Sequence, residues 1–174
     1  HNRVRRQRQM CIRDRYLWAT EYLVNNGWKH YEVSNFAKPN YQGRMNQMVW
    51  NGSGYLGVGV GAHSYDGKSR WGNLRPLHRY LELLEENCWP IAFTETLTQT
   101  EKANEFLMLQ LRQTKGLSLK KWDDDFAPKN WMDNHSDVLR AWQKEGLLNC
   151  IGNRIVLTKK GLLVADALTT ELSL

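Results

Sequence analysis

The chain has 174 residues, 41% of them hydrophobic and eight of them Trp, which is enough to bury a core and excludes wholesale disorder. Its formal net charge is +6, yet six Arg and one Asp lie within residues 1–15, so this short tail alone carries +5. Residues 16–174 are therefore close to neutral, and their charge predicts no nucleic-acid partner.

The amino-terminal segment HNRVRRQRQMCIRDR has neither an apolar period nor the apolar core of a signal peptide. It resembles translated adapter read-through from the ends of metagenomic contigs, and a natural basic arm is the alternative. We therefore treat residues 1–15 as a non-native or disordered tail and leave them out of the fold prediction. If this is right, the natural chain was cut off at its amino end.

The three cysteines, Cys11, Cys88 and Cys150, are far apart and form no CxxC or CxxxCxxC motif. Their spacing predicts no metal or iron–sulfur site. A sparse, odd number of cysteines is typical of a reducing compartment. No apolar run approaches the length of a membrane span, so we expect a cytoplasmic protein without a transmembrane segment.

Residues 15–97 have the pattern of an α/β protein. A helix is expected over residues 15–26, ended by Gly27, and a strand over 28–37. Helix, tight turn and strand are the repeating unit of a parallel sheet or barrel. An edge strand at residues 68–71, a helix over 76–87 and an extended segment at 91–97 follow, and a shift in composition then predicts a domain boundary near residue 98.

The most unusual stretch is YLGVGVGAHSY, residues 55–65, in which Gly57, Gly59 and Gly61 alternate with apolar residues. The period of two predicts a strand, one face of which has no side chains. Such a face either packs closely on another backbone or lets a ligand approach, and both interpretations stay open. A nucleotide-binding fingerprint is excluded, because the spacing is not GxGxxG and a turn follows.

From residue 98 onward the pattern predicts a winged-helix-like module. Thr98 and Glu101 have the spacing of a capping box, Gly152-Asn153 is typical of a hairpin turn, and Thr158 is placed to cap the last helix. The expected elements are three helices, a hairpin and a closing helix, at residues 98–113, 118–126, 131–145, 147–157 and from 158 onward.

Few side chains suggest chemistry by themselves. His63 has no second histidine at metal-ligand spacing, so it is a base, a ligand or a hydrogen-bonded rim residue. Residues 123–125, three consecutive Asp, are most simply a solvated face. The third helix of the predicted module carries Asp133, Asp137 and Glu145 against Arg140 and Lys144, a charge that argues against DNA-groove binding.

Three segments together resemble the HemW-type family of radical S-adenosylmethionine proteins, which comprises heme chaperones and proteins similar to oxygen-independent coproporphyrinogen III oxidase. The segments are YEVSNFAKP, RMNQMVW and YLGVGVGAHSYDG, at residues 31–39, 44–50 and 55–67. Residues 107–119 and 145–168 resemble the family's C-terminal domain. The resemblance implies the end of a (β/α) radical S-adenosylmethionine barrel at residues 16–75, a connecting helix and extended linker at 76–97, and a winged-helix-like HemN C-terminal domain at 98–174.

The resemblance also implies cofactors for the full-length protein. The family's CxxxCxxC motif, which holds a [4Fe–4S] cluster with S-adenosylmethionine, would precede the present sequence. We therefore expect the isolated chain to bind no cofactor and to be catalytically inert. In the related coproporphyrinogen dehydrogenases, the residue after the Ala of this strand touches S-adenosylmethionine. The resemblance therefore implies that His63 contacts this ligand, with Gly59, Gly61 and Ala62 letting the backbone come close; the family's GPGAH reads GVGAH here.

A heme-binding HNxxYW pattern of the chaperone branch corresponds to residues 45–50. Asn46 and Trp50 match, whereas Met45 and Val49 replace the His and the Tyr, so imidazole ligation of heme is not predicted here. Met45, Asn46 and Trp50 are the expected heme face, heme or porphyrin the expected cargo, and an apo-hemoprotein its acceptor. The alternative hypotheses are a non-enzymatic winged-helix interaction module with residues 16–97 as its partner platform, and a remnant without a ligand.

Overall fold

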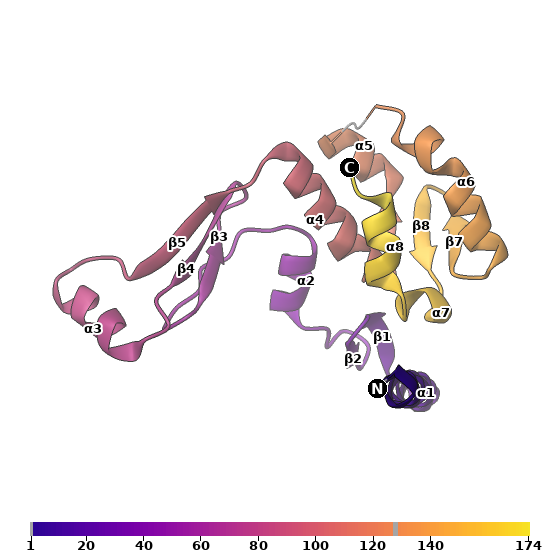
Figure 1. The fold of residues 1–174 in the computed structure, drawn as a ribbon, viewed down its shortest axis with the longest axis horizontal. Coiled ribbons are helices and arrows are strands. Elements are labelled where there is room, and N and C mark those ends of the chain that lie inside the picture. Colours follow the sequence, from indigo (N-terminus) through magenta and orange to yellow (C-terminus); the bar gives the residue numbers. More distant parts are fainter. Residues whose placement is uncertain (1, 127–128) are drawn as a thin grey trace. The chain divides into compact units, whose positions relative to one another are not determined.

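The computed structural model describes residues 2–126 and 129–174, with their side chains from residue 10 onward (Figure 1). The chain divides into two compact units. Unit 1 consists of the residues up to Gly43 together with Leu107–Leu174, and unit 2 consists of Arg44–Phe106. Most of the buried apolar side chains belong to unit 1.

Unit 1 begins with helix α1 (Asn2–Asn25) and a hairpin of β1 (Lys29–Glu32) and β2 (Asn35–Ala37). The helix expected from residue 15 thus starts at Asn2, so residues 2–15 are helical; their origin as read-through stays a prediction. The single strand expected over residues 28–37 is wrong. The chain turns between β1 and β2, where the Glu32 carboxylate accepts the Ser34 N–H at 3.1 Å.

The hairpin is hydrogen-bonded to the segment that follows α4 (Gln99–Leu111). The Val33 N–H donates to the Arg112 carbonyl at 2.9 Å, and the Thr114 N–H donates to the Tyr31 carbonyl at 3.1 Å. Glu32 also forms an antiparallel bridge with Gln113. Both neighbours of β1 are therefore antiparallel, which contradicts the expected parallel sheet.

The predicted elements of the C-terminal part are confirmed, except that the last helix is divided in two at Leu163 and Val164. Strands β6, β8 and β7 form an antiparallel sheet in that order. After α4 the elements are β6 (Leu117–Ser118), α5 (Leu119–Phe126), α6 (Trp131–Lys144), β7 (Leu148–Ile151), β8 (Arg154–Leu157), α7 (Lys159–Leu162) and α8 (Ala165–Leu172).

The core of unit 1 is centred on Trp122, which is fully buried. Its ring lies 5.3 Å from that of Phe126 and 5.1 Å from that of Trp131, measured between centroids. The Trp131 indole N–H donates to the Leu172 carbonyl at 2.9 Å, which ties the start of α6 to the end of α8. Because the Trp131–Leu172 bond joins residues 41 positions apart, it helps to fix the tertiary arrangement of the helices around the aromatic cluster.

The two N-caps predicted from single motifs are confirmed. Thr98 Oγ1 accepts the Glu101 N–H at 3.2 Å, and the Glu101 carboxylate accepts the Thr98 N–H at 2.7 Å. The Thr98 N–H, as the main donor, holds the pKa of Glu101 below its usual value. At α7, Thr158 Oγ1 accepts the Gly161 N–H at 3.1 Å. Both helix starts thus satisfy backbone donors that would otherwise lack partners.

Unit 2 contains helix α2 (Arg44–Trp50), strands β3 (His63–Tyr65), β4 (Ser69–Asn73) and β5 (Ile91–Thr96), and helix α3 (Leu77–Glu85). The strands form one antiparallel sheet in the order β3-β4-β5, with α3 inserted between β4 and β5 (Figure 1). Every strand pair among the described residues is antiparallel, and these strands form no closed barrel. The assignment of residues 16–75 to the end of a (β/α) barrel stays a prediction.

Strand β4 is the central strand of this sheet, whereas an edge strand was expected at residues 68–71. The turn at Asp66 and Gly67 sends the chain back alongside β3. The Asp66 carboxylate accepts the Ser69 and Lys68 N–H groups at 2.6 and 2.8 Å, which lowers its pKa. On the other side, Arg70 of β4 donates to Glu95 of β5 at 2.7 Å, and this bond is the main cause of the raised Arg70 pKa.

Candidate functional site

The glycine-rich stretch at residues 55–65 is mostly a loop, so the strand expected over its whole length is wrong. Only His63–Tyr65 are in a strand. Tyr55 and Tyr65 form an isolated antiparallel bridge, with reciprocal N–H to carbonyl distances of 2.7 and 2.9 Å, so the chain returns on itself. Gly59 and Gly61 make this return with φ values of +100° and +64°, which residues other than glycine rarely adopt.

The three glycines have different surroundings. A methyl group on Gly57 would overlap the carbonyl group of His63, so close packing of the backbone explains this glycine. On Gly61 it would lie 3.3 Å from Arg75 Cγ. On Gly59 it would meet no atom within 4 Å, so the backbone there is open to an approaching group. Of the two interpretations of this stretch, packing applies at Gly57, and space for a ligand exists at Gly59.

The loop is fixed by residues that sequence reasoning missed. The Asn73 side-chain amide donates to the Gly59 carbonyl at 2.9 Å, and the Asn73 N–H donates to the Ala62 carbonyl at the same distance. The Gly57 N–H donates at 2.9 Å to the hydroxyl of Ser64, a residue with no exposed surface. Neither Asn73 nor Ser64 belongs to a recognisable motif. Only the alternation of the AHSY segment could have placed Ser64 inside.

His63 lies at the exposed start of β3. Its imidazole packs edge-on against Phe93 of β5, with ring centroids 5.5 Å apart. Within the described part of the chain, the ring nitrogens of His63 make no hydrogen bond to another residue. An accessible imidazole at the end of a fixed glycine loop can donate a hydrogen bond to a ligand or accept one from it.

The residues expected to face heme lie on α2. Asn46 and Trp50 are four positions apart and therefore share one side of the helix, with Asn46 exposed and Trp50 half-buried. Met45 lies on a different side, together with Met48, and the two side chains are 52% and 46% exposed. The structure thus brings the two family-matching residues together and separates them from Met45.

Metal-ligating residues do not gather in the described part of the chain. Over residues 2–126 and 129–174, no three His, Cys, Asp or Glu side chains lie close enough to hold a metal ion. Cys11, Cys88 and Cys150 are exposed free thiols. No helix within the same ranges is long and apolar enough to cross a membrane.

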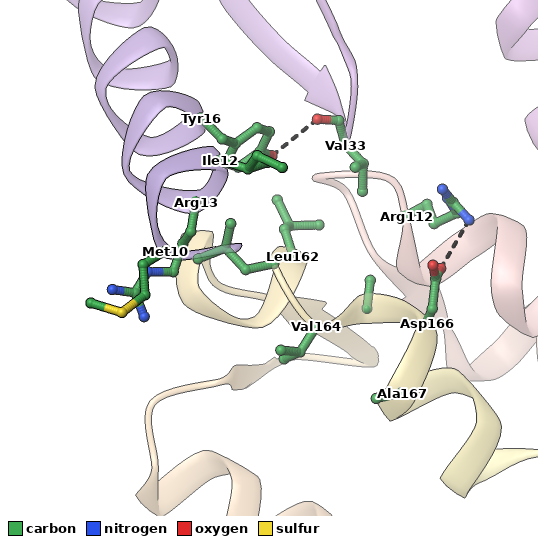
Figure 2. A pocket seen from close by; sticks show the side chains of 12 residues that line it. Met10, Ile12, Arg13, Tyr16, Val33, Arg112, Leu162, Val164, Asp166 and Ala167 are labelled. Carbon is green, nitrogen blue, oxygen red and sulfur yellow. Dashed lines mark hydrogen bonds and ion pairs between the residues drawn. The ribbon is translucent and has the colours of Figure 1, made fainter. Parts of the chain in front are cut away.

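A cavity of about 770 Å³ lies in unit 1 between α1, Val33, Arg112 and the α7–α8 segment (Figure 2). At its edges Tyr16 donates to the Val33 carbonyl at 3.0 Å and Arg112 pairs with Asp166 at 2.9 Å. It contains none of the predicted site residues. Because one wall is formed by Met10, Ile12 and Arg13 of the segment that resembles read-through, we assign this cavity no function.

Known proteins resemble this chain over most of its length. The HemN C-terminal domain family matches residues 97–164. The Bacillus subtilis (strain 168) protein named heme chaperone HemW is 31% identical over 141 residues, which cover 81% of this chain and 37% of that protein. The Mycobacterium tuberculosis (strain H37Rv) heme chaperone HemW is 33% identical over 158 residues, covering 91% of this chain and 38% of that protein.

A solved structure has the same fold. It is the radical S-adenosylmethionine enzyme coproporphyrinogen III oxidase, HemN, from Escherichia coli, with a TM-score of 0.69 and 19% identity, covering 90% of this chain and 40% of that one. The chain spans less than half the length of each of these relatives. The similar sequences, the matching C-terminal domain and the shared fold point to the same family. The chain therefore belongs to the HemW/HemN-like family of radical S-adenosylmethionine proteins.

Proposed function

We propose that this chain is the C-terminal part of a radical S-adenosylmethionine, [4Fe–4S]-dependent protein of heme metabolism, a heme chaperone or a coproporphyrinogen III oxidase-like protein. The observation that carries the proposal is the loop from Gly59 to His63. Its backbone is fixed by Asn73, the space beside Gly59 is open, and an exposed imidazole stands at its end. The chaperone activity is favoured over the oxidase, because the relatives at 31% and 33% identity are named heme chaperones.

The loop fits S-adenosylmethionine, and the cysteines do not fit the cluster. Gly59, Gly61 and Ala62 would let the ligand approach the backbone, and His63 would supply a hydrogen bond at the rim. When bound with its cluster, S-adenosylmethionine supplies radical chemistry. An Fe–S cluster needs several thiolates together, whereas Cys11, Cys88 and Cys150 are dispersed and exposed. We therefore propose that the cluster is held outside this chain and that the chain alone is inert; turnover by the isolated chain would contradict this.

Heme or porphyrin is the proposed cargo, and an apo-hemoprotein in the cytoplasm is the proposed acceptor. Asn46 and Trp50 share one side of α2 and would contact the ligand there, with the Trp50 ring as an apolar surface. Met45 and Met48 are exposed on a different side of α2, where their thioethers offer a second apolar surface. We propose no imidazole ligation by this helix.

The S-adenosylmethionine site can be tested in a full-length protein that carries this chain behind the cluster-binding part. The double variant Gly61→Val/His63→Trp fills the approach to the loop and should abolish binding in calorimetric titration. Gly67→Val is the matched control, because Gly67 has a comparable positive φ of +93° and nothing within 4 Å, but lies in the turn after β3. Unchanged affinity in the double variant would reject the site.

The heme face is tested separately by following the Soret band during heme titration. Asn46→Ala/Trp50→Ala should weaken binding, while Met132→Ala, which removes an exposed methionine of α6, should not. Transfer of heme to an apo-protein would support the chaperone, and loss of carboxyl groups from coproporphyrinogen would support the oxidase. Equal heme affinity in the α2 variant and the control would remove α2 from the proposal.

A further inference from the structure

A second cavity of unit 1, of about 310 Å³, lies beside the β1–β2 hairpin. Three aromatic side chains, one Ala and one Lys line it, and we call it the aromatic pocket: Trp28, Phe36, Ala37, Lys38 and Tyr41. Its volume is at the lower end of the range for small-ligand sites, about 300–1,000 Å³. It shares no residue with the glycine loop or with α2, so it is separate from the candidate sites described above.

The turn at residues 38–41 fixes one side of the aromatic pocket. The Tyr41 N–H donates to the Lys38 carbonyl at 3.0 Å. Pro39 and Asn40 are the central residues, and the φ of +70° at Asn40 is typical of a type II turn, which favours proline first and glycine or asparagine second. This turn presents Tyr41 with 81% of its surface exposed. Because the backbone is already constrained, covering this side chain with a ligand would cost little further conformational entropy.

The other two aromatic rings of the pocket are held by their neighbours. The Trp28 N–H donates to the Leu23 carbonyl at 3.0 Å, which fixes the chain just after α1. Phe36 stacks on His30 with ring centroids 4.4 Å apart and 13° between the ring planes. Ala37, the next residue, is buried and contributes only a methyl group to the wall. The pocket is therefore largely formed before a ligand binds, as is usual for small-molecule sites.

Lys38 alone among the five lining residues carries a charge. Its Nζ lies 5.0 Å from the centroid of the Trp28 ring and donates to the Asn26 carbonyl at 2.9 Å. These two contacts position the ammonium group, which has three N–H donors in all. In the part of the chain that the structure describes, no carboxylate pairs with Lys38. A positioned cation without a counter-ion, beside three aromatic rings, suits an anion with a flat apolar body.

We propose that the aromatic pocket binds a small aromatic carboxylate, a molecule of one or two fused rings that carries one carboxyl group. The ring would pack against Tyr41 and Phe36, and the carboxylate would accept a hydrogen bond from the Lys38 ammonium. The volume limits the ligand to a small ring system, and the charge of Lys38 selects an anion over a neutral molecule of the same shape. The inference is independent of the proposed S-adenosylmethionine and heme sites.

The test uses this chain and naphthoate, with naphthamide as the neutral molecule of the same shape. Binding is followed by NMR through the indole N–H signal of Trp28 and the backbone amide signal of Tyr41. Naphthoate should bind saturably and shift both signals, and naphthamide should bind at least about tenfold more weakly. Equal affinity for the two molecules would overturn the proposal, and so would the absence of saturable binding.

Variants separate the site from general charge attraction. Lys38→Met should weaken naphthoate binding at least about tenfold and leave naphthamide binding unchanged, which also shows that the pocket is intact. Lys29→Met is the matched control, because this exposed lysine of β1 does not line the pocket, and it should keep full affinity. Tyr41→Leu should weaken the binding of both molecules.

Equal losses in Lys38→Met and Lys29→Met would overturn the proposal, because the net charge would then explain the binding. Heme also carries carboxylates on an aromatic ring system, but it is larger than the proposed ligand. Heme is therefore added to the naphthoate complex of the Asn46→Ala/Trp50→Ala variant, which lacks the proposed heme face. Naphthoate should stay bound, and its displacement would overturn the assignment to a small acid.

Discussion

The Asn73 side-chain amide donates a hydrogen bond to the carbonyl of Gly59 at 2.9 Å, while the Asn73 N–H bonds Ala62 at the same distance. One residue of β4 thus holds both ends of the tight return in the glycine loop. The contact is side chain to backbone across two elements, and it explains how a loop with two positive-φ glycines keeps one conformation.

Asn73→Ala should loosen this loop without unfolding the sheet. Loss of one such hydrogen bond costs about 0.5–1.5 kcal/mol of unfolding free energy. Amide exchange at Gly61 and Ala62 should become faster, measured by hydrogen–deuterium exchange. Asn149→Ala, an exposed asparagine of β7 in unit 1, is the control and should leave these amides unchanged. Unchanged protection of Gly61 and Ala62 in Asn73→Ala would show that the backbone hydrogen bonds hold the loop without the Asn73 side chain.

Gly57→Ala should disturb β3 directly, because the new methyl group would overlap the His63 carbonyl. Overpacking of this kind costs about 1–3 kcal/mol of unfolding free energy. The pairing of His63 with Gly72 should weaken, visible as amide chemical-shift changes in both strands. Gly67→Ala provides strain without overlap, since its methyl group would meet no atom within 4 Å. If both variants perturb His63 and Gly72 equally, steric contact is not the cause.

The sequence predicted the C-terminal elements well, because each carries its own local signal. Thr98 with Glu101, Gly152 with Asn153, and Thr158 each determine a cap or turn within a few residues, and the structure has all of them. Residues 28–37 and 55–65 were predicted as strands from composition and alternation. Both contain a reversal of the chain that is held by longer-range contacts, namely the bond of the Val33 N–H to the Arg112 carbonyl and the bond of the Asn73 side chain to Gly59.

The candidate site, too, could be predicted from the sequence only where a local pattern marks it. The glycine pattern located the loop and His63, but it did not distinguish Gly57, which packs on the His63 carbonyl, from Gly59, which faces open space. That difference depends on how the chain folds back, and alternation alone carries no information about it. Asn73 and Ser64, which fix the loop, are ordinary polar residues in the sequence. Their roles follow only from the antiparallel pairing of β3 with β4.

Gly161→Ala tests the packing of the C-terminal module. A methyl group there would overlap the Leu147 carbonyl and lie 3.3 Å from Leu157 Cβ. Alanine is favoured over glycine within a helix by about 1 kcal/mol. We expect the overlap with fixed backbone to outweigh this gain and to lower the melting temperature. Gly152→Ala, at the open tip of the β7–β8 turn, should have a smaller effect. A rise in stability for Gly161→Ala would mean that α7 shifts freely.

His30 should make the stability of unit 1 depend on pH. Burial lowers its pKa, opposed by the Val33 carbonyl and the charge of Glu32, while Lys159 lowers it further. Its ring stacks on Phe36 with centroids 4.4 Å apart, and its Nε2 lies 3.4 Å from the Tyr16 hydroxyl. The folded state therefore resists protonation more than the unfolded state, where the pKa of histidine is about 6.5.

Because the unfolded state binds more protons below about pH 6.5, this histidine should reduce stability as the pH falls through that value and have no such effect above it. His30→Gln should flatten the decrease in unfolding free energy between about pH 7.5 and 5.5, the range around the pKa of unfolded histidine. Denaturant titrations of both proteins at several pH values measure this slope. The titrations at the alkaline end measure the unfolding free energy that is lost when the imidazole ring itself is replaced. An identical slope in the two proteins would show that His30 is not the group responsible.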